Sequence, residues 1–188
     1  MPKRTILERL EETKAILDGH FLLSSGLHSN RYIQCAKLLQ HPIHATWCGE
    51  HLADILPDEE IDVVVSPAIG GIIIGHEVAR ALDVRHIFVE KVDGTPTLRR
   101  GFHIFEGDNA VVVEDVITTG KSTNEVIDVI RKAGGRVVCA CAIVNRGGGE
   151  KLDVPFVALT ELNIEVFEPE HCPMCLEGMP FVKPGSRE

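Results

Sequence analysis

The chain has 188 residues, the length of one domain whose core is large enough to need no disulfide or metal for stability. Its 44% hydrophobic and 25% charged residues are typical of a globular protein and exclude intrinsic disorder as the default state. The formal net charge of -9 argues against a general nucleic-acid binder, because such a protein must neutralise phosphates.

The apolar stretches are too short for a membrane protein. The longest runs have about eight residues, whereas a membrane-spanning helix needs about 20. No apolar signal core follows Met1, and the chain runs straight into an amphipathic pattern. We therefore expect a cytoplasmic protein with no membrane and no nucleic acid among its partners.

The first part of the chain predicts two helices. Thr5 and Glu8 form a capping-box pattern at the start of a helix that apolar spacing extends until Gly19 can close it. A second helix is expected to begin near Pro42, because proline suits a first helical position, and to stop at Pro57.

From residue 61 on, apolar β-branched runs alternate with helical patterns. Such alternation implies right-handed crossovers and a mainly parallel sheet flanked by helices, whose ligands bind at the carboxyl ends of the strands. Several runs are apolar on both faces, as strands covered by helices on both sides must be. We expect strands at 61–65, 86–89, 110–113, 136–144 and 154–159, and helices ending near residue 82 and spanning 122–133.

Two carboxylates and three hydroxyls follow the third of these strands. Glu114 and Asp115 end the strand, and Thr118, Thr119 and Ser122 lie in the loop and first helical turn after it. Free N–H groups and the positive dipole end of a helix form an anion site that suits a phosphate. The acids fit hydroxyls or a magnesium ion, so a sugar that carries a phosphate would satisfy both halves of the segment.

The same segment nearly matches a nucleotide-binding P-loop. That pattern has a glycine where this chain has Asp115, and a carboxylate there would face the polyphosphate, so we do not favour a P-loop nucleotidase. Gly120 lets the backbone approach a ligand closely. Residues 122–125 repeat the capping-box pattern, so we expect Ser122 to cap the following helix.

A hydrophobic strand, two acids and a Thr/Gly loop into a helix resemble the ribose-phosphate motif of the type I phosphoribosyltransferases. Over nearly its whole length the chain is similar to the orotate phosphoribosyltransferases. Residues 20–33 resemble their base-covering hood and residues 66–71 their diphosphate-side loop. Residues 144–146 match the strand end with a base-binding arginine, and residues 183–187 resemble the ending of one branch.

The resemblance implies an α/β protein with the type I phosphoribosyltransferase fold, in which helices flank a mainly parallel central sheet. A small hood is expected to form from both ends of the chain. The single domain would span residues 1–188, with the hood at about 1–40 and 160–188 and the core at about 41–159.

The resemblance also implies the reaction, in which orotate and 5-phosphoribosyl 1-diphosphate (PRPP) give orotidine 5′-phosphate and diphosphate. Mg²⁺ is the implied cofactor, carried with the substrate near Asp115 rather than fixed by the protein alone. The expected PRPP-binding residues are Lys91, Glu114, Asp115, Val116, Ile117, Thr118, Thr119, Gly120, Lys121 and Ser122.

The orotate-binding and catalytic residues follow from the same resemblance. Arg146 offers a planar fork that matches carboxylate or carbonyl oxygens, and the acids would place negative charge near the developing cation. The expected orotate-binding residues are Ser25, Gly26, Thr118 and Arg146. The expected catalytic residues are Glu114, Asp115, Arg99 and Arg100.

The segment from Lys91 to Gly101 is expected to be a mobile loop, because Gly94 and Pro96 interrupt any regular strand. Its cations would reach the diphosphate. The resemblance implies a homodimer with shared active sites, in which this loop reaches over the neighbouring site, and a two-fold pair is also the commonest oligomer.

Two other function classes stay open on the sequence alone. A purine-base phosphoribosyltransferase would use the same ribose-phosphate loop, although the hood segment favours orotate. A regulator that senses PRPP would need a DNA-reading domain or a basic face, for which the chain has neither the length nor the charge.

The cysteines fall into two groups. Four lie in apolar surroundings and are expected to be small buried hydrophobes: Cys35, Cys48, Cys139 and Cys141. Cys172 and Cys175 form a lone Cys-x-x-Cys with no second pair at the spacing of a zinc finger, so a metal site is not favoured and the question stays open.

Overall fold

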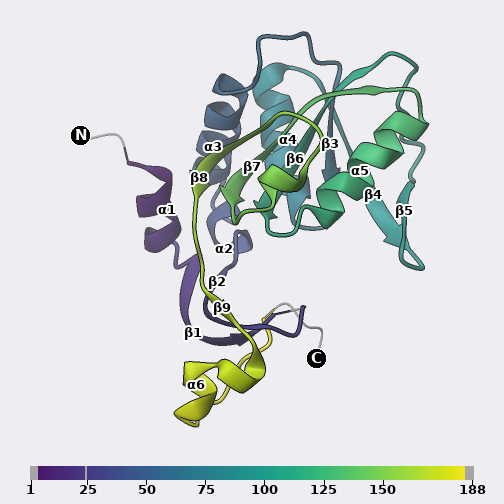
Figure 1. The fold of residues 1–188 in the computed structure, drawn as a ribbon. Coiled ribbons are helices and arrows are strands. Elements are labelled where there is room, and N and C mark those ends of the chain that lie inside the picture. The colour runs from purple at the N-terminus through teal and green to yellow at the C-terminus, as the bar shows by residue number, and fades with distance from the viewer. Residues whose placement is uncertain (1–3, 24, 185–188) are drawn as a thin grey trace.

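The computed structural model describes residues 4–23 and 25–184, and Figure 1 shows the chain from purple at the N-terminus to yellow at the C-terminus. The expectations that involve Ser24 or residues 185–187 lie outside the described residues. Two sheets organise the fold, one of six strands in the order β5-β4-β3-β6-β7-β8 and one of three in the order β1-β2-β9.

The six-stranded sheet is the core. Its neighbouring strands pair in parallel except for β4 and β5, which are antiparallel, so the expected α/β class is confirmed. The strands are β3 (Val63–Pro67), β4 (Arg85–Val92), β5 (Thr95–Leu98), β6 (Asn109–Ile117), β7 (Arg136–Asn145) and β8 (Phe156–Glu161). The helices around it are α3 (Pro42–Asp54), α4 (Gly71–Leu82) and α5 (Lys121–Lys132).

Helices cover both faces of this sheet, which explains the strands that are apolar on both sides. Val64 and Val111 pack with α3 and α4 in one cluster, and both are fully buried. Their neighbours Val65 and Val112 point to the other face and pack with α5. Within residues 4–23 and 25–184, no helix is both long and apolar enough to cross a membrane.

The hood is the three-stranded sheet with the short elements next to it. Its strands are β1 (Ile16–Leu22), β2 (His28–Ile33) and β9 (Val166–Phe167). The short helices α2 (Ala36–Leu39) and α6 (Pro173–Leu176) and the single 3-10 turns at Gly149–Lys151 and Pro169–His171 complete the described chain. Strands β1 and β2 from the N-terminal part of the chain thus lie together with β9 and α6 from its C-terminal part, below the core sheet (Figure 1).

The expected N-terminal helix is too long. Helix α1 (Ile6–Glu12) stops early, and Lys14 takes a left-handed φ of 52° that ends any helical continuation. Gly19, expected to close the helix, lies inside β1 instead. The segment forms a strand because it pairs with β2, and the backbone hydrogen bonds of this pairing stabilise a strand more than the apolar spacing stabilises a helix.

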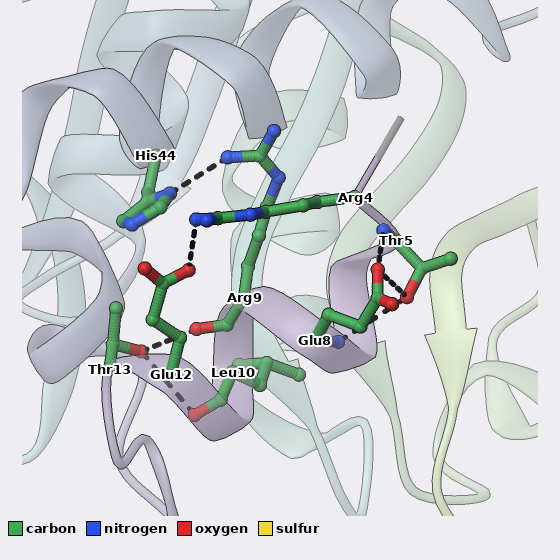
Figure 2. Close-up of polar contacts among 8 residues, drawn as sticks. All are labelled: Arg4, Thr5, Glu8, Arg9, Leu10, Glu12, Thr13 and His44. Carbon is green, nitrogen blue, oxygen red and sulfur yellow. Dashed lines mark hydrogen bonds and ion pairs between the residues drawn. The ribbon is translucent and has the colours of Figure 1, made fainter. Parts of the chain in front are cut away.

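The start of α1 is as expected, and Figure 2 shows how the helix docks. Thr5 N–H donates to Glu8 Oε2 at 2.7 Å, and Glu8 N–H donates to Thr5 Oγ1 at 3.3 Å, so the capping box is confirmed. Arg9 reaches α3, where its Nη1 lies 2.8 Å from His44 Nδ1 and its guanidinium lies 4.2 Å from the Trp47 ring. These contacts attach the N-terminal helix to the core.

Candidate active site

The parallel strands of the core point their carboxyl ends toward the hood (Figure 1). Strands β3, β6 and β7 are direct neighbours, so the loops that follow them lie side by side at this edge. These loops hold the strand-end acids, the Thr/Gly segment and Arg146. The topology therefore gathers most of the residues singled out in the sequence at one edge, where α/β sheets bind ligands.

Glu114 and Asp115 form a buried acidic pair at the end of β6. The side chain of Glu114 is 7% exposed, and its Oε1 accepts a hydrogen bond of 3.3 Å from the Asp115 N–H. Asp115 Oδ1 accepts one of 2.9 Å from the Val116 N–H. Burial raises the pKa of both carboxyls, and the charge of Asp115 raises the pKa of Glu114 further. Such a pair favours a cation or hydroxyl donors beside it.

The loop between β3 and α4 lies directly against these acids. A Cβ atom at Gly70 would stand only 2.7 Å from Asp115 Oδ1, closer than side chains approach. Glycine at position 70 therefore lets the backbone lie beside the carboxylate. The expected diphosphate-side loop and the expected sugar-binding acids are thus in contact.

The Thr/Gly segment leads into α5 differently from the prediction. The helix begins at Lys121 with Gly120 as its N-cap, so Ser122 lies in the first turn and the expected capping box is wrong. The reason is that Glu125 pairs with Lys91 instead, with Nζ and Oε2 2.7 Å apart. Gly120 has no side chain to cap the helix, although the Lys121 N–H donates to Thr119 Oγ1 at 3.4 Å. The following N–H groups of the first turn stay available to an anion.

A pocket of about 220 Å³ lies beside this helix start. Its lining combines the diphosphate-side loop, β4 and the first turns of α5, and so joins Lys91 to Ser122. The lining residues are Pro67, Ala68, Val89, Lys91, Pro96, Ser122, Glu125 and Val126. A larger pocket of about 620 Å³ lies in the hood, and its lining includes none of the expected site residues.

Arg146 is a half-buried cation with one buried nitrogen that has no partner in the described part of the chain. Its backbone N–H donates to Ile117 O at 2.8 Å, which ties the end of β7 to the end of β6. Its Nε is buried and has no hydrogen-bond partner among the described residues. Burial lowers the pKa of Arg146. A half-buried guanidinium with an unsatisfied nitrogen has the chemistry to bind an anion.

Tyr32 belongs to this site, and the sequence reasoning missed it. Burial and then the charge of Asp115 raise the pKa of Tyr32, whereas the charge of Arg146 lowers it, so the three side chains lie within electrostatic reach. Tyr32 ends the hood segment and is the chain's sole tyrosine, which is the signal that could have identified it. The hood thus contributes an aromatic group within electrostatic reach of Arg146.

The glycine-rich turn after Arg146 brings it close to the Thr/Gly segment. Asn145 Oδ1 accepts two backbone hydrogen bonds, of 3.0 and 3.1 Å, from the turn 147–149. A Cβ atom at Gly148 would lie 2.6 Å from Thr118 O, so only glycine permits this approach. Arg146 and Thr118, both expected to bind orotate, therefore lie on adjoining loops.

Ser25 and Gly26 lie elsewhere, at the tip of the β1–β2 hairpin. Ser25 Oγ accepts a hydrogen bond of 3.4 Å from the Leu27 N–H, which closes the turn. Along an extended strand, the six residues from Gly26 to Tyr32 span about 20 Å. The described contacts connect Tyr32 to Arg146, and none of them connects the hairpin tip to it.

The segment expected to be a mobile loop contains strand β5, so the expectation that Gly94 and Pro96 exclude a regular strand is wrong. Lys91 pairs with Pro96 in the antiparallel β4–β5 ladder. Pro96 fits because β5 is an edge strand, where a missing N–H costs no ladder bond. Asp93 and Gly94, with φ of 49° and 79°, form the turn of this hairpin.

Arg99 and Arg100 follow β5 at the edge of the sheet. Strands β4 and β3 separate β5 from β6, which places the arginine segment roughly 14 Å from the strand that ends at Asp115. Arg100 is held by Glu90 within the hairpin. Within one chain, the structure therefore does not bring these arginines to the acidic pair.

Comparisons with known proteins agree with this arrangement. The phosphoribosyl transferase domain family matches residues 34–172. The chain is 50% identical over 189 residues to the orotate phosphoribosyltransferase of Caldicellulosiruptor bescii, covering 100% of both chains. It is 51% identical over 181 residues to that of Carboxydothermus hydrogenoformans, covering 94% of each.

Solved structures share the fold. The orotate phosphoribosyltransferase from Aeropyrum pernix is similar with a TM-score of 0.70 and 28% identity, over 84% of this chain and 94% of that one. An adenine phosphoribosyltransferase from Thermoanaerobacter pseudethanolicus has a TM-score of 0.62 at 21% identity, over 70% and 88% of the two chains, and is similar in fold alone.

Proposed function

The chain belongs to the orotate phosphoribosyltransferases of the phosphoribosyl transferase family, and from this premise we propose which of its residues carry the reaction. The enzyme transfers the phosphoribosyl group of PRPP to orotate and releases diphosphate. The bond from the anomeric carbon to the diphosphate oxygen breaks, and a bond from that carbon to a ring nitrogen of orotate forms. Positive charge develops on the sugar during this exchange, and the leaving group carries negative charge.

Glu114 and Asp115 hold the ribose hydroxyls of PRPP. Their burial raises the pKa of both carboxyls, so hydroxyl donors that satisfy the carboxylate oxygens restore the charged form. Held in this way, the acids place negative charge beside the anomeric carbon where positive charge develops. They act as preorganised electrostatic groups and need no proton transfer.

The 5-phosphate binds at the start of α5. The first-turn N–H groups carry no side-chain cap from Gly120, and the positive end of the helix dipole favours an anion there. Thr118 and Thr119 are exposed at the same loop and can donate their hydroxyls. Lys121 and Ser122 complete the set in the first turn of the helix.

Arg146 determines which base the enzyme accepts. Its buried Nε has no partner among residues 4–23 and 25–184, and an unpaired buried donor is costly until an acceptor arrives. The carboxylate of orotate supplies two oxygens in the planar geometry of a guanidinium fork, whereas adenine and hypoxanthine carry no carboxylate. Tyr32 adds an aromatic group from the hood. The buried Nε of Arg146, without a hydrogen-bond partner among the described residues, is the observation that supports orotate best.

Mg²⁺ is compatible with the acidic pair Glu114 and Asp115. The two carboxyls at the end of β6 are oxygen donors of the kind that Mg²⁺ takes, and their raised pKa values mark a place that gains from a nearby cation. Asp115 lies against the diphosphate-side loop at Gly70, where it would meet an ion carried by the substrate. When bound, Mg²⁺ neutralises charge on the diphosphate.

The cations of the β4–β5 hairpin serve the leaving diphosphate. Lys91 lies in the pocket that Ser122 also lines, and is placed to act within its own subunit. Arg99 and Arg100 lie about three strand spacings from β6, so we assign them to the site of a second subunit in a two-fold dimer.

An absorbance assay for orotate loss tests the function. We expect consumption of orotate only when PRPP and Mg²⁺ are both present. Adenine, hypoxanthine and uracil serve as control substrates in the same assay. Consumption of a purine in place of orotate would overturn the assignment of the base.

A further inference from the structure

Four metal-ligating side chains meet in the hood, far from the strand-end acids. His20 lies on β1 and His28 on β2, and Cys172 is the N-cap of α6 while Cys175 lies within that helix. One ligand atom from each lies within 4.8 Å of all the others. The cysteine pair that had no second pair in the sequence thus finds two histidines from the other end of the chain.

Three sulfur–nitrogen distances match a tetrahedral metal centre. Zn–S bonds of about 2.3 Å and Zn–N bonds of about 2.0–2.1 Å at tetrahedral angles separate sulfur from nitrogen by about 3.5 Å. Here Cys172 Sγ lies 3.5 Å and Cys175 Sγ 3.7 Å from His20 Nε2, and Cys175 Sγ lies 3.3 Å from His28 Nδ1. The two ring nitrogens are 2.7 Å apart and need to separate by about 0.6 Å.

The hydrogen bonding of His20 prepares it as a ligand. Its Nδ1 lies 2.8 Å from the carbonyl oxygen of Met179, which can only accept a hydrogen bond. Nδ1 therefore carries the proton, and Nε2 presents its lone pair to the cluster. Metal-bound histidines usually donate their other ring N–H in this way, which fixes the tautomer and the ring orientation.

The surroundings protect the cluster. His20 is 3% exposed, His28 4% and Cys172 0%, and only Cys175 lies partly at the surface. The Phe181 ring packs on both imidazoles, with centroids 5.7 and 5.2 Å from those of His20 and His28. Two buried imidazoles and two thiols turn their ligand atoms toward one another here, which is the arrangement that a shared metal ion requires.

We propose that His20, His28, Cys172 and Cys175 bind one Zn²⁺ ion. Two thiolates and two imidazoles in a tetrahedral set are the ligands that zinc prefers, and hard cations such as Mg²⁺ prefer oxygen. All four positions are filled by the protein, so the ion is structural and leaves no place for a substrate. The site is separate from the Mg²⁺ proposed for catalysis.

The ion would tie the C-terminal segment to the hood hairpin. The described backbone contacts between them are few: Leu22 N–H donates to Val182 O at 2.9 Å, and Val182 N–H donates to His20 O at 2.8 Å. Helix α6 has only four residues and cannot be stable by itself. A metal that joins β1, β2 and α6 would hold the strand that carries Tyr32.

The test begins with the metal content of the full-length protein, purified without chelator and analysed by plasma mass spectrometry. We expect about one zinc per chain, and below about a tenth in the Cys172→Ser/Cys175→Ser double variant. The matched control is His171→Ala, which removes the exposed histidine next to Cys172 and should keep the zinc. Zinc at the same level in the double variant would overturn the proposal.

A second measurement uses the unaltered chain, so that misfolding of the variant cannot decide the result. Removal of zinc with a chelator should lower the melting temperature and free two thiols for titration. Refilling with Co²⁺ should give the intense visible bands of tetrahedral cobalt with thiolate ligands. Protein that holds no metal, whether its thiols stay free or Cys172 and Cys175 form a disulfide detected by mass, would contradict the site.

Discussion

Arg100 donates two hydrogen bonds of 2.9 Å, from Nε and Nη2, to the carboxylate of Glu90 across the β4–β5 hairpin. The bond from Arg100 is the main reason that the pKa of Glu90 is lowered. The pair is exposed, so it adds little stability, but it keeps a cation at the outer edge of the sheet. Arg100 is thus held away from the acids of its own chain, which is why we propose that it acts at the site of a second subunit.

The hairpin arginines are predicted to act across the dimer. Asp115→Asn and the double variant Arg99→Ala/Arg100→Ala should each be nearly inactive alone. A hybrid dimer has one site with both defects and one site with neither, so mixing should restore about a quarter of normal activity after full exchange. The measurement is orotate consumption before and after subunit exchange, with exchange verified by native mass spectrometry. A mixture that exchanges and stays inactive would place the arginines in their own subunit or outside catalysis.

Asp115→Asn should reduce turnover about 100- to 1,000-fold, the usual loss for one electrostatic stabiliser of a transition state. The fold should survive, because Asp115 lies at a strand end and not in the apolar core. Steady-state kinetics and circular dichroism check the two parts. Asp128→Asn, an exposed carboxylate on α5, is the control and should stay near normal. Normal turnover of folded Asp115→Asn would remove the acid from the site.

Arg146→Ala should weaken orotate binding about 10- to 150-fold, because the carboxylate loses a charged hydrogen-bond partner worth about 1.5–3 kcal/mol. The affinity for PRPP should change by no more than a few-fold. Separate measurements of the KM for each substrate give the comparison. Arg131→Ala, which removes an exposed arginine paired with Asp153, should leave both values unchanged. Selective loss of PRPP affinity in Arg146→Ala would move that residue to the other half of the site.

His86 predicts a pH dependence of stability. Its Nε2 lies 2.7 Å from Ser66 Oγ, and burial, with a smaller effect of His76, lowers the pKa of His86 to about 4. The folded state therefore keeps the ring neutral while the unfolded chain binds a proton below about pH 6.5. Stability should be full above pH 6.5 and fall toward pH 4, by at most about 3 kcal/mol and less where solvent reaches the ring.

Urea unfolding at several pH values measures this dependence. His86→Gln can still bond to Ser66 and cannot titrate, so its loss of stability between pH 6.5 and 4 should be smaller than that of the unaltered chain. His103→Gln removes an exposed histidine and should follow the unaltered chain. Parallel curves for all three proteins would show that the ring at position 86 is not held neutral.

Local patterns in the sequence predicted the core well. The runs that became β3 and β6, the end of α4 near residue 82 and the proline start of α3 all formed close to the expected residues, because each pattern is satisfied within one element. The acids and hydroxyls from Glu114 to Ser122 could be proposed as a site for the same reason, since they are contiguous. The position of the phosphate loop at the strand ends followed from the alternation of strands and helices.

The sequence predicted secondary structure and capping incorrectly where a residue pairs with a segment distant in the chain. Residues around Gly19 have the spacing of a helix, but pairing with β2 makes them a strand. Residues 122–125 have a capping-box pattern, but Glu125 pairs with Lys91 from another strand. A local sequence pattern contains no information about a hydrogen bond or ion pair with a segment far away in the chain.

The sequence by itself therefore determined the class of fold and the family of the enzyme, and it supplied the segment proposed to bind the sugar phosphate. Only the tertiary structure decided that Tyr32 lies near Arg146, and that His20 and His28 meet Cys172 and Cys175. The physical reason is distance along the chain. Each of these groups is useful only beside partners more than 100 residues away, and the pairing of strands in two sheets brings them together.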